Sequence, residues 1–148
     1  EKIKRCAATE KKEGRGIVKG KVHDGNAYFM GGISGHAGLF STAEDLSHFV
    51  KTIIRNGFYE EKNVLNYKSI RLMTHSFTEN LNESRGMGWQ INRGFSYCDL
   101  ASENAIYHTG FTGTSILIDK DFGFVLLTNR VHPDRNNTKL IGLRKIQI

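Results

Sequence analysis

The sequence predicts an α+β domain in which an antiparallel sheet is flanked by helices. Two apolar runs lie within residues 115–129, and the polar turn between them, 120–123, ends in glycine, which is typical of a β-hairpin. Residues 42–56 carry apolar side chains at helical spacing. Because helical patterns mostly precede the strands instead of alternating with them, the sequence favours segregated layers over a parallel sheet.

The composition is that of one globular domain. The chain has 148 residues, 39% of them hydrophobic, and a domain of this size can bury about two thirds of its unfolded surface. No run approaches the roughly 18 apolar residues that predict a membrane-spanning helix. The first residue is Glu1 and no apolar signal segment follows it, so we expect a chain that is processed, trimmed or a fragment, and its cellular location stays open.

The net charge of +6 is concentrated at the two ends of the chain. No aromatic residues are interleaved with the first basic run to stack on bases, so the sequence does not predict nucleic-acid binding. The two cysteines, Cys6 and Cys98, have neither the spacing of a zinc site nor that of a disulfide framework. The terminal basic residues are Lys2, Lys4, Arg5, Lys11, Lys12, Arg15, Lys19, Lys21, Lys139, Arg144 and Lys145.

Glycine punctuates the first 40 residues. Residues 1–22 are polar with little apolar pattern, which predicts an extended arm or loop with no packed element. Residues 31–38 contain four glycines around His36, and such a segment does not hold a regular helix or strand comfortably. Two interpretations stay open, a functional loop and a tight buried turn.

The middle of the chain predicts two helices and a strand. Ser41 is the expected N-cap of helix 42–56, with Glu44 completing a capping box and Gly57 ending the pattern. A turn at 59–63 leads to a shorter helix, 66–76, and an exposed loop, 77–85, leads to a strand over 86–91. The residues expected to face inward are Leu46, Phe49, Val50, Ile53, Ile54, Ile70, Leu72, Met73, Met87, Trp89 and Ile91.

The hairpin 115–129 is apolar on both side-chain parities, which predicts strands that are covered on both faces. A polar connection, 92–104, and the short run 105–107 precede it. A polar turn over 130–137 and a helix over 138–147 are expected to follow.

The stretch from His108 to Gly113 is a poor strand by packing, because glycine leaves bare backbone. In one interpretation Gly110 and Gly113 merely mark a bulge or bend. In the other, the bare backbone lets a ligand come close, and the backbone N–H of Phe111 could stabilise the oxyanion of an acyl-transfer reaction.

The sequence lacks an activated nucleophile for that reaction. Neither Ser-x-x-Lys nor Gly-x-Ser-x-Gly occurs in the 148 residues, and Ser102-Glu103-Asn104 is only a loose Ser-x-Asn match. Metal ligation is a further alternative, but the candidate side chains have no recognised ligand spacing, so the sequence predicts neither a metal ion nor a cofactor. Those candidates are His23, Asp24, His36, His108 and His132.

Several blocks, in order and from about residue 6 to the C-terminus, strongly resemble the penicillin-binding-protein and class C β-lactamase-like serine hydrolases. They are His23-Asp24, the glycine-rich block 31–42, Asp45-Leu46, 86–89, 108–115 and 126–130. The resemblance implies a partial β-lactamase/transpeptidase-like fold and an active site of three motifs: Ser-x-x-Lys, Tyr-x-Asn or Ser-x-Asn, and Lys-Thr-Gly or His-Thr-Gly. Only the third motif is matched, and the first two would lie upstream of Glu1.

By this resemblance, His108 would orient the substrate or assist the family's tyrosine, and Thr109 would contact a substrate carboxylate or carbonyl. After Gly110, the N–H of Phe111 would form half of the oxyanion hole, and Thr112 and Gly113 would border the substrate. The resemblance gives His36 no catalytic role, and we expect it to pack behind the site.

We therefore expect the C-terminal portion of a serine hydrolase that acts on a β-lactam, a D-alanyl peptide or an ester. Without the nucleophile, this chain would be inactive by itself. The alternative is a non-enzymatic domain that binds a peptide or partner along the same strand edge. Surface left uncovered by a missing half would favour homo-oligomers.

Overall fold

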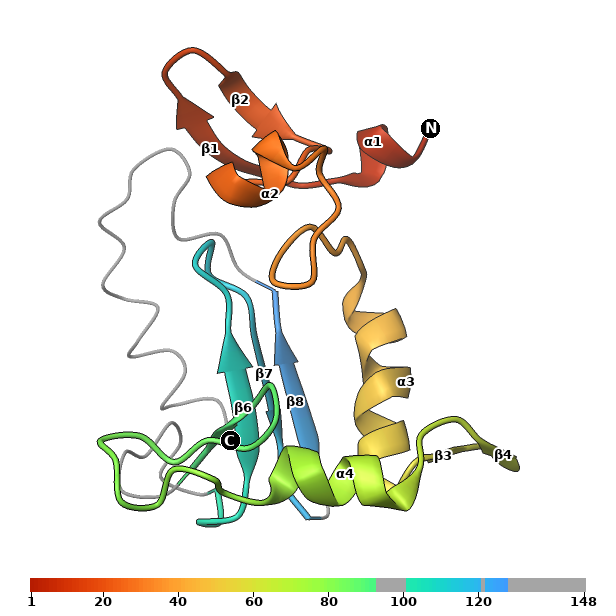
Figure 1. Ribbon diagram of the computed structural model, residues 1–148. Coiled ribbons are helices and arrows are strands. Elements are labelled where there is room, and N and C mark those ends of the chain that lie inside the picture. The colour runs from red at the N-terminus through yellow and green to blue at the C-terminus, as the bar shows by residue number, and fades with distance from the viewer. Residues whose placement is uncertain (93–100, 121, 128–148) are drawn as a thin grey trace.

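The computed structural model describes residues 1–92, 101–120 and 122–127, and it confirms the predicted α+β class. Its main sheet is antiparallel, with strand order β5-β6-β7-β8. Helix α3 runs alongside this sheet, and α4 crosses near one end of it (Figure 1). The bounds are α3 Ala43–Ile54, α4 Tyr67–Thr74, β5 Gln90–Ile91, β6 Ile106–Thr109, β7 Ser115–Ile118 and β8 Gly123–Leu126.

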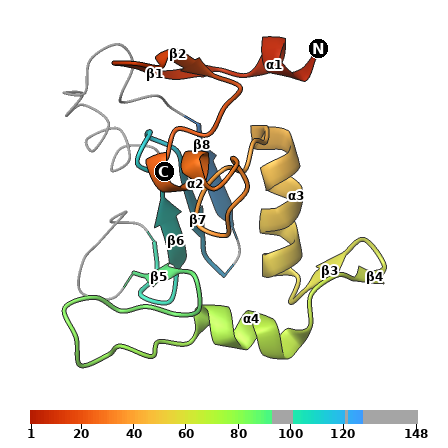
Figure 2. The ribbon, with the colours of Figure 1, turned by 45° about the horizontal axis from the view of Figure 1, so that its top comes forward.

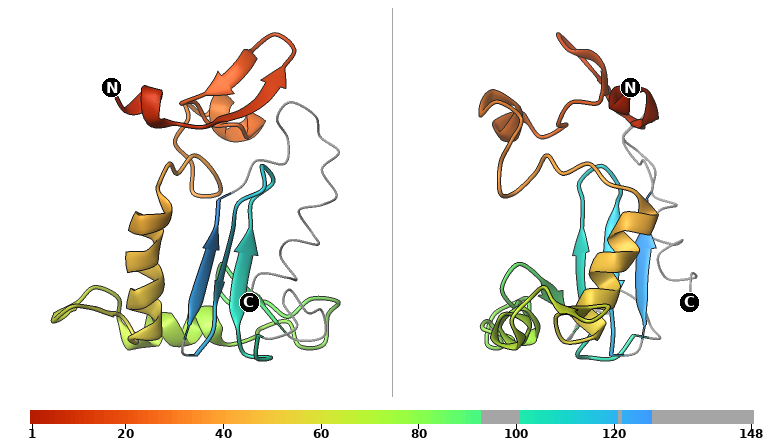
Figure 3. Two further views of the ribbon diagram at one scale, coloured as in Figure 1. Left: turned by 180° about the vertical axis from the view of Figure 1, so that it is seen from behind. Right: turned by 90° about the vertical axis from the view of Figure 1, so that its right-hand side faces the viewer.

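The predicted hairpin is confirmed as β7 and β8 over its described residues, and β7 is buried on both faces, whereas Leu127 just after β8 is 44% exposed. Leu117 and Ile118 are consecutive residues that point to opposite faces, and they expose only 1% and 3% of their surface. Ile118 belongs to the core formed with α3 and α4, whereas Leu117 packs with Tyr107 on the other face. The two views in Figure 3 show α3 lying against one face of the sheet.

Helix α3 confirms the predicted helix, but its N-cap is Thr42 and not Ser41. Thr42 has the extended backbone of an N-cap, and its hydroxyl accepts a hydrogen bond from the backbone N–H of Asp45. The Ser41 hydroxyl instead donates to the carbonyl of Thr42 at 3.5 Å. At the other end, the helix closes through Gly57, whose φ of +99° suits glycine and whose N–H donates to the Thr52 carbonyl at 2.8 Å.

Helix α4 is shorter than predicted, and one of its three expected core residues is exposed. Asn66 caps it through the N–H of Lys68, and Ile70 is buried as predicted. Leu72, however, is 42% exposed. With roughly 3.6 residues per turn, two residues that are two positions apart in a helix point in directions about 200° apart around its axis. Ile70 and Leu72 therefore cannot lie on the same face.

The strand predicted over 86–91 is wrong except at its end, where β5 covers only two residues. Gly88 has a φ of +80°, which interrupts an extended strand, and Met87 is 61% exposed. Trp89 is buried as expected, with its ring stacked on Phe49 at 6.2 Å between centroids.

The prediction that residues 1–22 hold no packed element is also wrong. They form α1 (Lys2–Arg5) and an antiparallel hairpin of β1 (Ala8–Lys12) and β2 (Gly16–Lys19), and Val18 is only 3% exposed. Two of the glycines that indicated a loop, Gly14 and Gly16, supply positive φ at the turn of this hairpin. Figure 2 shows the hairpin at one end of the molecule, beyond the main sheet, and α2 (Gly25–Phe29) follows it along the chain.

The remaining predictions divide between confirmed elements and undescribed residues. The turn at 59–63 is confirmed between β3 (Phe58–Tyr59) and β4 (Lys62–Asn63). The predicted turn over 130–137, the helix over 138–147, Cys98 and His132 lie outside the described residues. None of the described helices is long and apolar enough to cross a membrane.

Candidate functional site at the end of β6

Residues 108–113 form the end of a strand and a tight turn, not a continuous strand. His108 and Thr109 complete β6, and the chain then reverses into β7. The turn is closed by the Gly110 N–H, which donates to the Thr114 carbonyl at 2.7 Å, and by the Gly113 N–H, which donates to the Gly110 carbonyl at 3.0 Å.

Both glycines of this turn are required by its geometry. Gly113 is buried with a φ of +120°, which side chains rarely adopt, and a Cβ on Gly110 would overlap the Thr114 hydroxyl. The bend interpretation of the glycines is therefore correct, and it does not exclude a functional role. The turn fixes the backbone that follows His108 and Thr109.

Among residues 1–92, 101–120 and 122–127, no strand pairs with the outer edge of β6 beside these two residues. Strand β5 pairs with β6 only at Ile106 and Tyr107, while β7 continues to pair with it as far as Thr109. Within the described residues, β5 therefore does not extend alongside His108 and Thr109. An extended chain can hydrogen-bond to such an edge through its backbone.

The side chains of His108 and Thr109 lie on opposite faces of the sheet, as strand alternation requires. His108 follows Ile106 on the α3 face and is exposed, whereas Thr109 follows Tyr107 on the other face and is half-buried. A ligand at the edge would meet the imidazole from one face and the hydroxyl from the other.

Phe111 extends from the turn toward the N-terminal hairpin. It is 60% exposed, and its ring stacks on that of His23, with 5.6 Å between centroids and 23° between planes. His23 lies in the segment between β2 and α2. The sequence indicates His23 only as a candidate metal ligand and as part of a family block. Its contact with Phe111 could not be predicted, because local sequence patterns carry no signal for residues so far apart in the chain.

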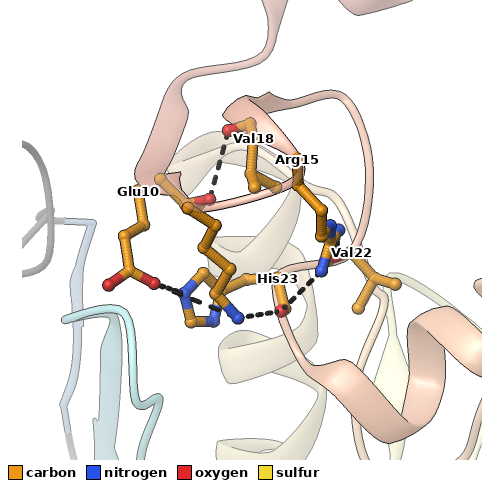
Figure 4. Close-up of polar contacts among 7 residues, drawn as sticks. Glu10, Arg15, Val18, Val22 and His23 are labelled. Carbon is orange, nitrogen blue, oxygen red and sulfur yellow. Dashed lines mark hydrogen bonds and ion pairs between the residues drawn. The ribbon is translucent and has the colours of Figure 1, made fainter.

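Polar contacts hold His23 in place (Figure 4). Its Nε2 lies 2.6 Å from Oε2 of Glu10 on β1, and the two side chains are only 11% and 5% exposed. The Lys12 ammonium donates to the His23 carbonyl at 3.1 Å, and the Arg15 guanidinium donates to the Val22 carbonyl at 2.8 Å. The β1–β2 hairpin is thereby connected to the Phe111 turn.

The glycine-rich segment around His36 is an exposed loop, so the buried-turn interpretation is wrong, and His36 is not packed behind the site. Its Nε2 lies 3.0 Å from Asp24 Oδ1, and its Nδ1 lies 2.6 Å from the Ser34 hydroxyl. Asp24 also caps α2 by accepting from the Ala27 N–H, and this bond, with the His36 contact, lowers the pKa of Asp24. We assign the Ser34–His36–Asp24 chain a structural role, because its carboxylate is committed to the helix cap.

Ser102, the loose Ser-x-Asn match, lies near the opposite end of β6 from the turn. Its hydroxyl donates to Asp119 Oδ1 at 2.6 Å and its backbone N–H to Oδ2 at 2.7 Å. Burial acts to raise the pKa of Asp119, but these bonds and one from the Lys120 N–H outweigh it and lower that pKa. Ser102 is thus a structural partner of Asp119 in this fold.

In residues 1–92, 101–120 and 122–127, no three His, Cys, Asp or Glu side chains are arranged to hold a metal ion. Two surface hollows lie elsewhere. One, of about 250 Å³, is beside Arg15 and Tyr28, and one, of about 430 Å³, is between α3 and the segment around Leu65.

Comparison with known proteins gives one family and several bacterial relatives. Residues 1–146 match the family model described as Beta-lactamase. The chain is 36% identical over 120 residues to an Escherichia coli K12 protein named for D-alanyl-D-alanine carboxypeptidase, covering 76% of this chain and 27% of that protein. It is 37% identical over 122 residues to a Bacillus subtilis 168 protein named N-acetylmuramyl-L-alanine amidase, covering 78% and 27%. The chain thus spans about a quarter of the length of these curated relatives.

Proposed function

This chain belongs to the β-lactamase family of serine hydrolases, and from that premise we propose that it forms one wall of an acyl-transfer active site. The wall consists of His108, Thr109 and Gly110 with the N–H of Phe111, bordered by Thr112 and Gly113. The nucleophilic serine and its base come from sequence outside these 148 residues. The chain by itself is therefore inactive.

The observation that carries the proposal is the open edge of β6, which ends in a rigid turn. Among the described residues β5 pairs no further than Tyr107, so of the next two residues Thr109, which has the same parity as Tyr107, directs its backbone N–H and C=O to the unpaired edge, while His108 directs its own toward β7. The turn then holds the Phe111 N–H where the strand ends, and backbone donors at fixed positions are what oxyanion stabilisation requires.

In the proposed reaction, the serine oxygen bonds to the acyl carbon and its proton passes to the base. The carbonyl oxygen gains negative charge, which the Phe111 N–H stabilises, and the bond to the leaving amine then breaks as that amine takes up a proton. Water hydrolyses the resulting acyl-enzyme. Loss of one oxyanion donor typically lowers such rates by about 10²- to 10³-fold.

We propose an acyl-D-alanyl peptide as the substrate class. The name of the Escherichia coli relative supports this class, since it refers to D-alanyl-D-alanine, whereas the Bacillus subtilis relative is named for the N-acetylmuramyl-L-alanine bond. Thr109 would bind the carboxylate or carbonyl of the terminal residue and His108 would orient the peptide. A β-lactam carries a comparable acyl group and serves as a covalent probe.

The test is covalent labelling of the full-length protein and of residues 1–148, each with a fluorescent β-lactam and with a fluorophosphonate. We expect labelling of the full-length protein and none of the 148-residue chain, because only the former carries the nucleophile. A Thr109→Val variant of the full-length protein should be labelled more slowly by the β-lactam. Stoichiometric labelling of the 148-residue chain would overturn the assignment of the nucleophile.

A second candidate function, favoured by the same open edge, is non-catalytic binding of an extended peptide that adds a strand beside His108 and Thr109. It differs from the first in that the full-length protein would bind a D-alanyl peptide but release it unchanged. Calorimetric binding without labelling and without peptide cleavage would favour this function.

A further inference from the structure

We infer that His23, held by Glu10, is a positioning residue for the Phe111 N–H. This inference rests on the proposed function, because the importance of that N–H depends on an oxyanion forming beside it. His23 does not touch the reacting atoms in this arrangement. It acts through the aromatic ring of Phe111.

The first step is the ring contact. The imidazole and the phenyl ring are nearly parallel, 23° apart, with centroids 5.6 Å from each other. Phe111 is 60% exposed, and the stack restrains the direction of its side chain. Stacked rings at this distance attract each other beyond the burial of their surface.

The second step is the anchoring of His23. The Glu10 carboxylate holds Nε2 at 2.6 Å, and both side chains are almost fully buried. The backbone beside the ring is fixed as well, because Lys12 and Arg15 donate to the carbonyls of His23 and Val22 (Figure 4). The ring therefore presents a fixed surface to Phe111.

The third step connects the phenyl ring to the backbone donor. Phe111 directly follows Gly110 in the turn, so the direction of its side chain and the orientation of its N–H are set at the same residue. A fixed Phe111 side chain restricts the rotation of its own backbone, including the N–H. An error of about 1 Å in placing a catalytic group can lower a rate by about 10²-fold.

The test uses full-length protein and separates binding from acylation by a chromogenic β-lactam. His23→Ala and His23→Gln should each lower the acylation rate constant by about 10- to 100-fold and leave the binding constant unchanged, since neither variant stacks on Phe111. His23→Tyr keeps a ring and a hydroxyl that can reach Glu10, so it should restore most of the rate. Glu13→Gln changes an exposed residue of the same hairpin and should have no effect.

A second measurement tests the positioning directly. In full-length protein labelled with ¹⁵N-phenylalanine, the Phe111 amide resonance is assigned by its loss in Phe111→Leu. We expect His23→Ala to shift this resonance and to speed its hydrogen exchange at least 10-fold, while Glu13→Gln leaves both unchanged.

The outcomes separate the two ideas. Unchanged acylation in His23→Ala, or an unmoved Phe111 resonance, overturns the role of His23 and leaves the proposed function standing. A wild-type protein that is never acylated overturns the proposed function, and the resonance then decides whether His23 positions Phe111. If all three His23 variants, His23→Tyr included, lost acylation rate to the same extent and were all lowered in melting temperature, His23 would have a merely structural role.

Discussion

At the scale of single residues, Ser115 has a buried hydroxyl for which the described residues supply no hydrogen-bond partner. The residue is 3% exposed, and its Oγ makes no hydrogen bond with the part of the chain that the structure describes. Leaving a buried polar group unsatisfied costs about 1–3 kcal/mol, so its removal relieves a penalty. Ser115 pairs with Thr109, which places this hydroxyl directly behind the proposed site.

We therefore predict that Ser115→Ala leaves the free energy of unfolding of the 148-residue chain unchanged or raises it, by up to about 1 kcal/mol. Ser76→Ala is the matched control, because that buried hydroxyl accepts from Ser84 Oγ at 2.8 Å. The control should lose about 1 kcal/mol in urea denaturation. A comparable loss in Ser115→Ala would mean that the hydroxyl does have a partner.

At the scale of elements, the contact between α3 and β8 depends on the absence of a side chain at Gly123. A Cβ built on Gly123 would overlap Cγ1 of Val50, which is a buried residue of the main core. The helix therefore approaches the strand more closely than any larger residue would allow. This approach holds α3 against the hairpin whose other end carries the proposed site.

We predict that Gly123→Ala lowers the free energy of unfolding by about 1–3 kcal/mol, the usual cost of overpacking a core. The loss in Gly123→Ala combined with Val50→Ala should be smaller than the sum of the two single losses, because the overlapping methyl is then gone. Gly35→Ala, where a Cβ meets nothing within 4 Å, should be neutral. Additive losses in the double variant would contradict the packing argument.

The elements that the sequence predicted well are those whose signals are local. The hairpin and α3 follow from periodicity, and Ile70 follows from helical spacing. The β1–β2 pairing and the stack of His23 on Phe111 could not be predicted, because they depend on residues that meet only in the folded chain. In the site, the sequence predicted the turn glycines. It did not predict that β5 begins only at Gln90, next to Tyr107, which depends on the positive φ of Gly88.

At the scale of the whole molecule, large apolar side chains are exposed along the segment from α2 to the start of α3. Ile33 and Leu39 expose 88% and 87% of their surface. Several large apolar side chains exposed in one segment are typical of an interface. The other exposed apolar residues in this segment are Tyr28, Phe29, Met30 and Phe40.

We propose that this segment is covered by the remainder of the full-length protein, and that the 148-residue chain by itself associates to cover it. Light scattering at micromolar concentration should then show dimers or larger species. Ile33→Ser combined with Leu39→Ser should shift the distribution toward monomer, whereas Glu13→Gln should not. A strictly monomeric wild-type chain would refute this expectation.

The shortness of β5 has a consequence for the length of peptide that the proposed site can accept. Each strand residue advances the chain by about 3.3 Å, so the two residues of β6 that lie beyond β5 offer an edge of roughly 7 Å. That edge is bounded by the Gly110 turn on one side and by β5 on the other. It is long enough for two extended residues of a peptide. We therefore propose that the site accepts about two extended residues of a peptide, and that a longer β5 would reduce this number.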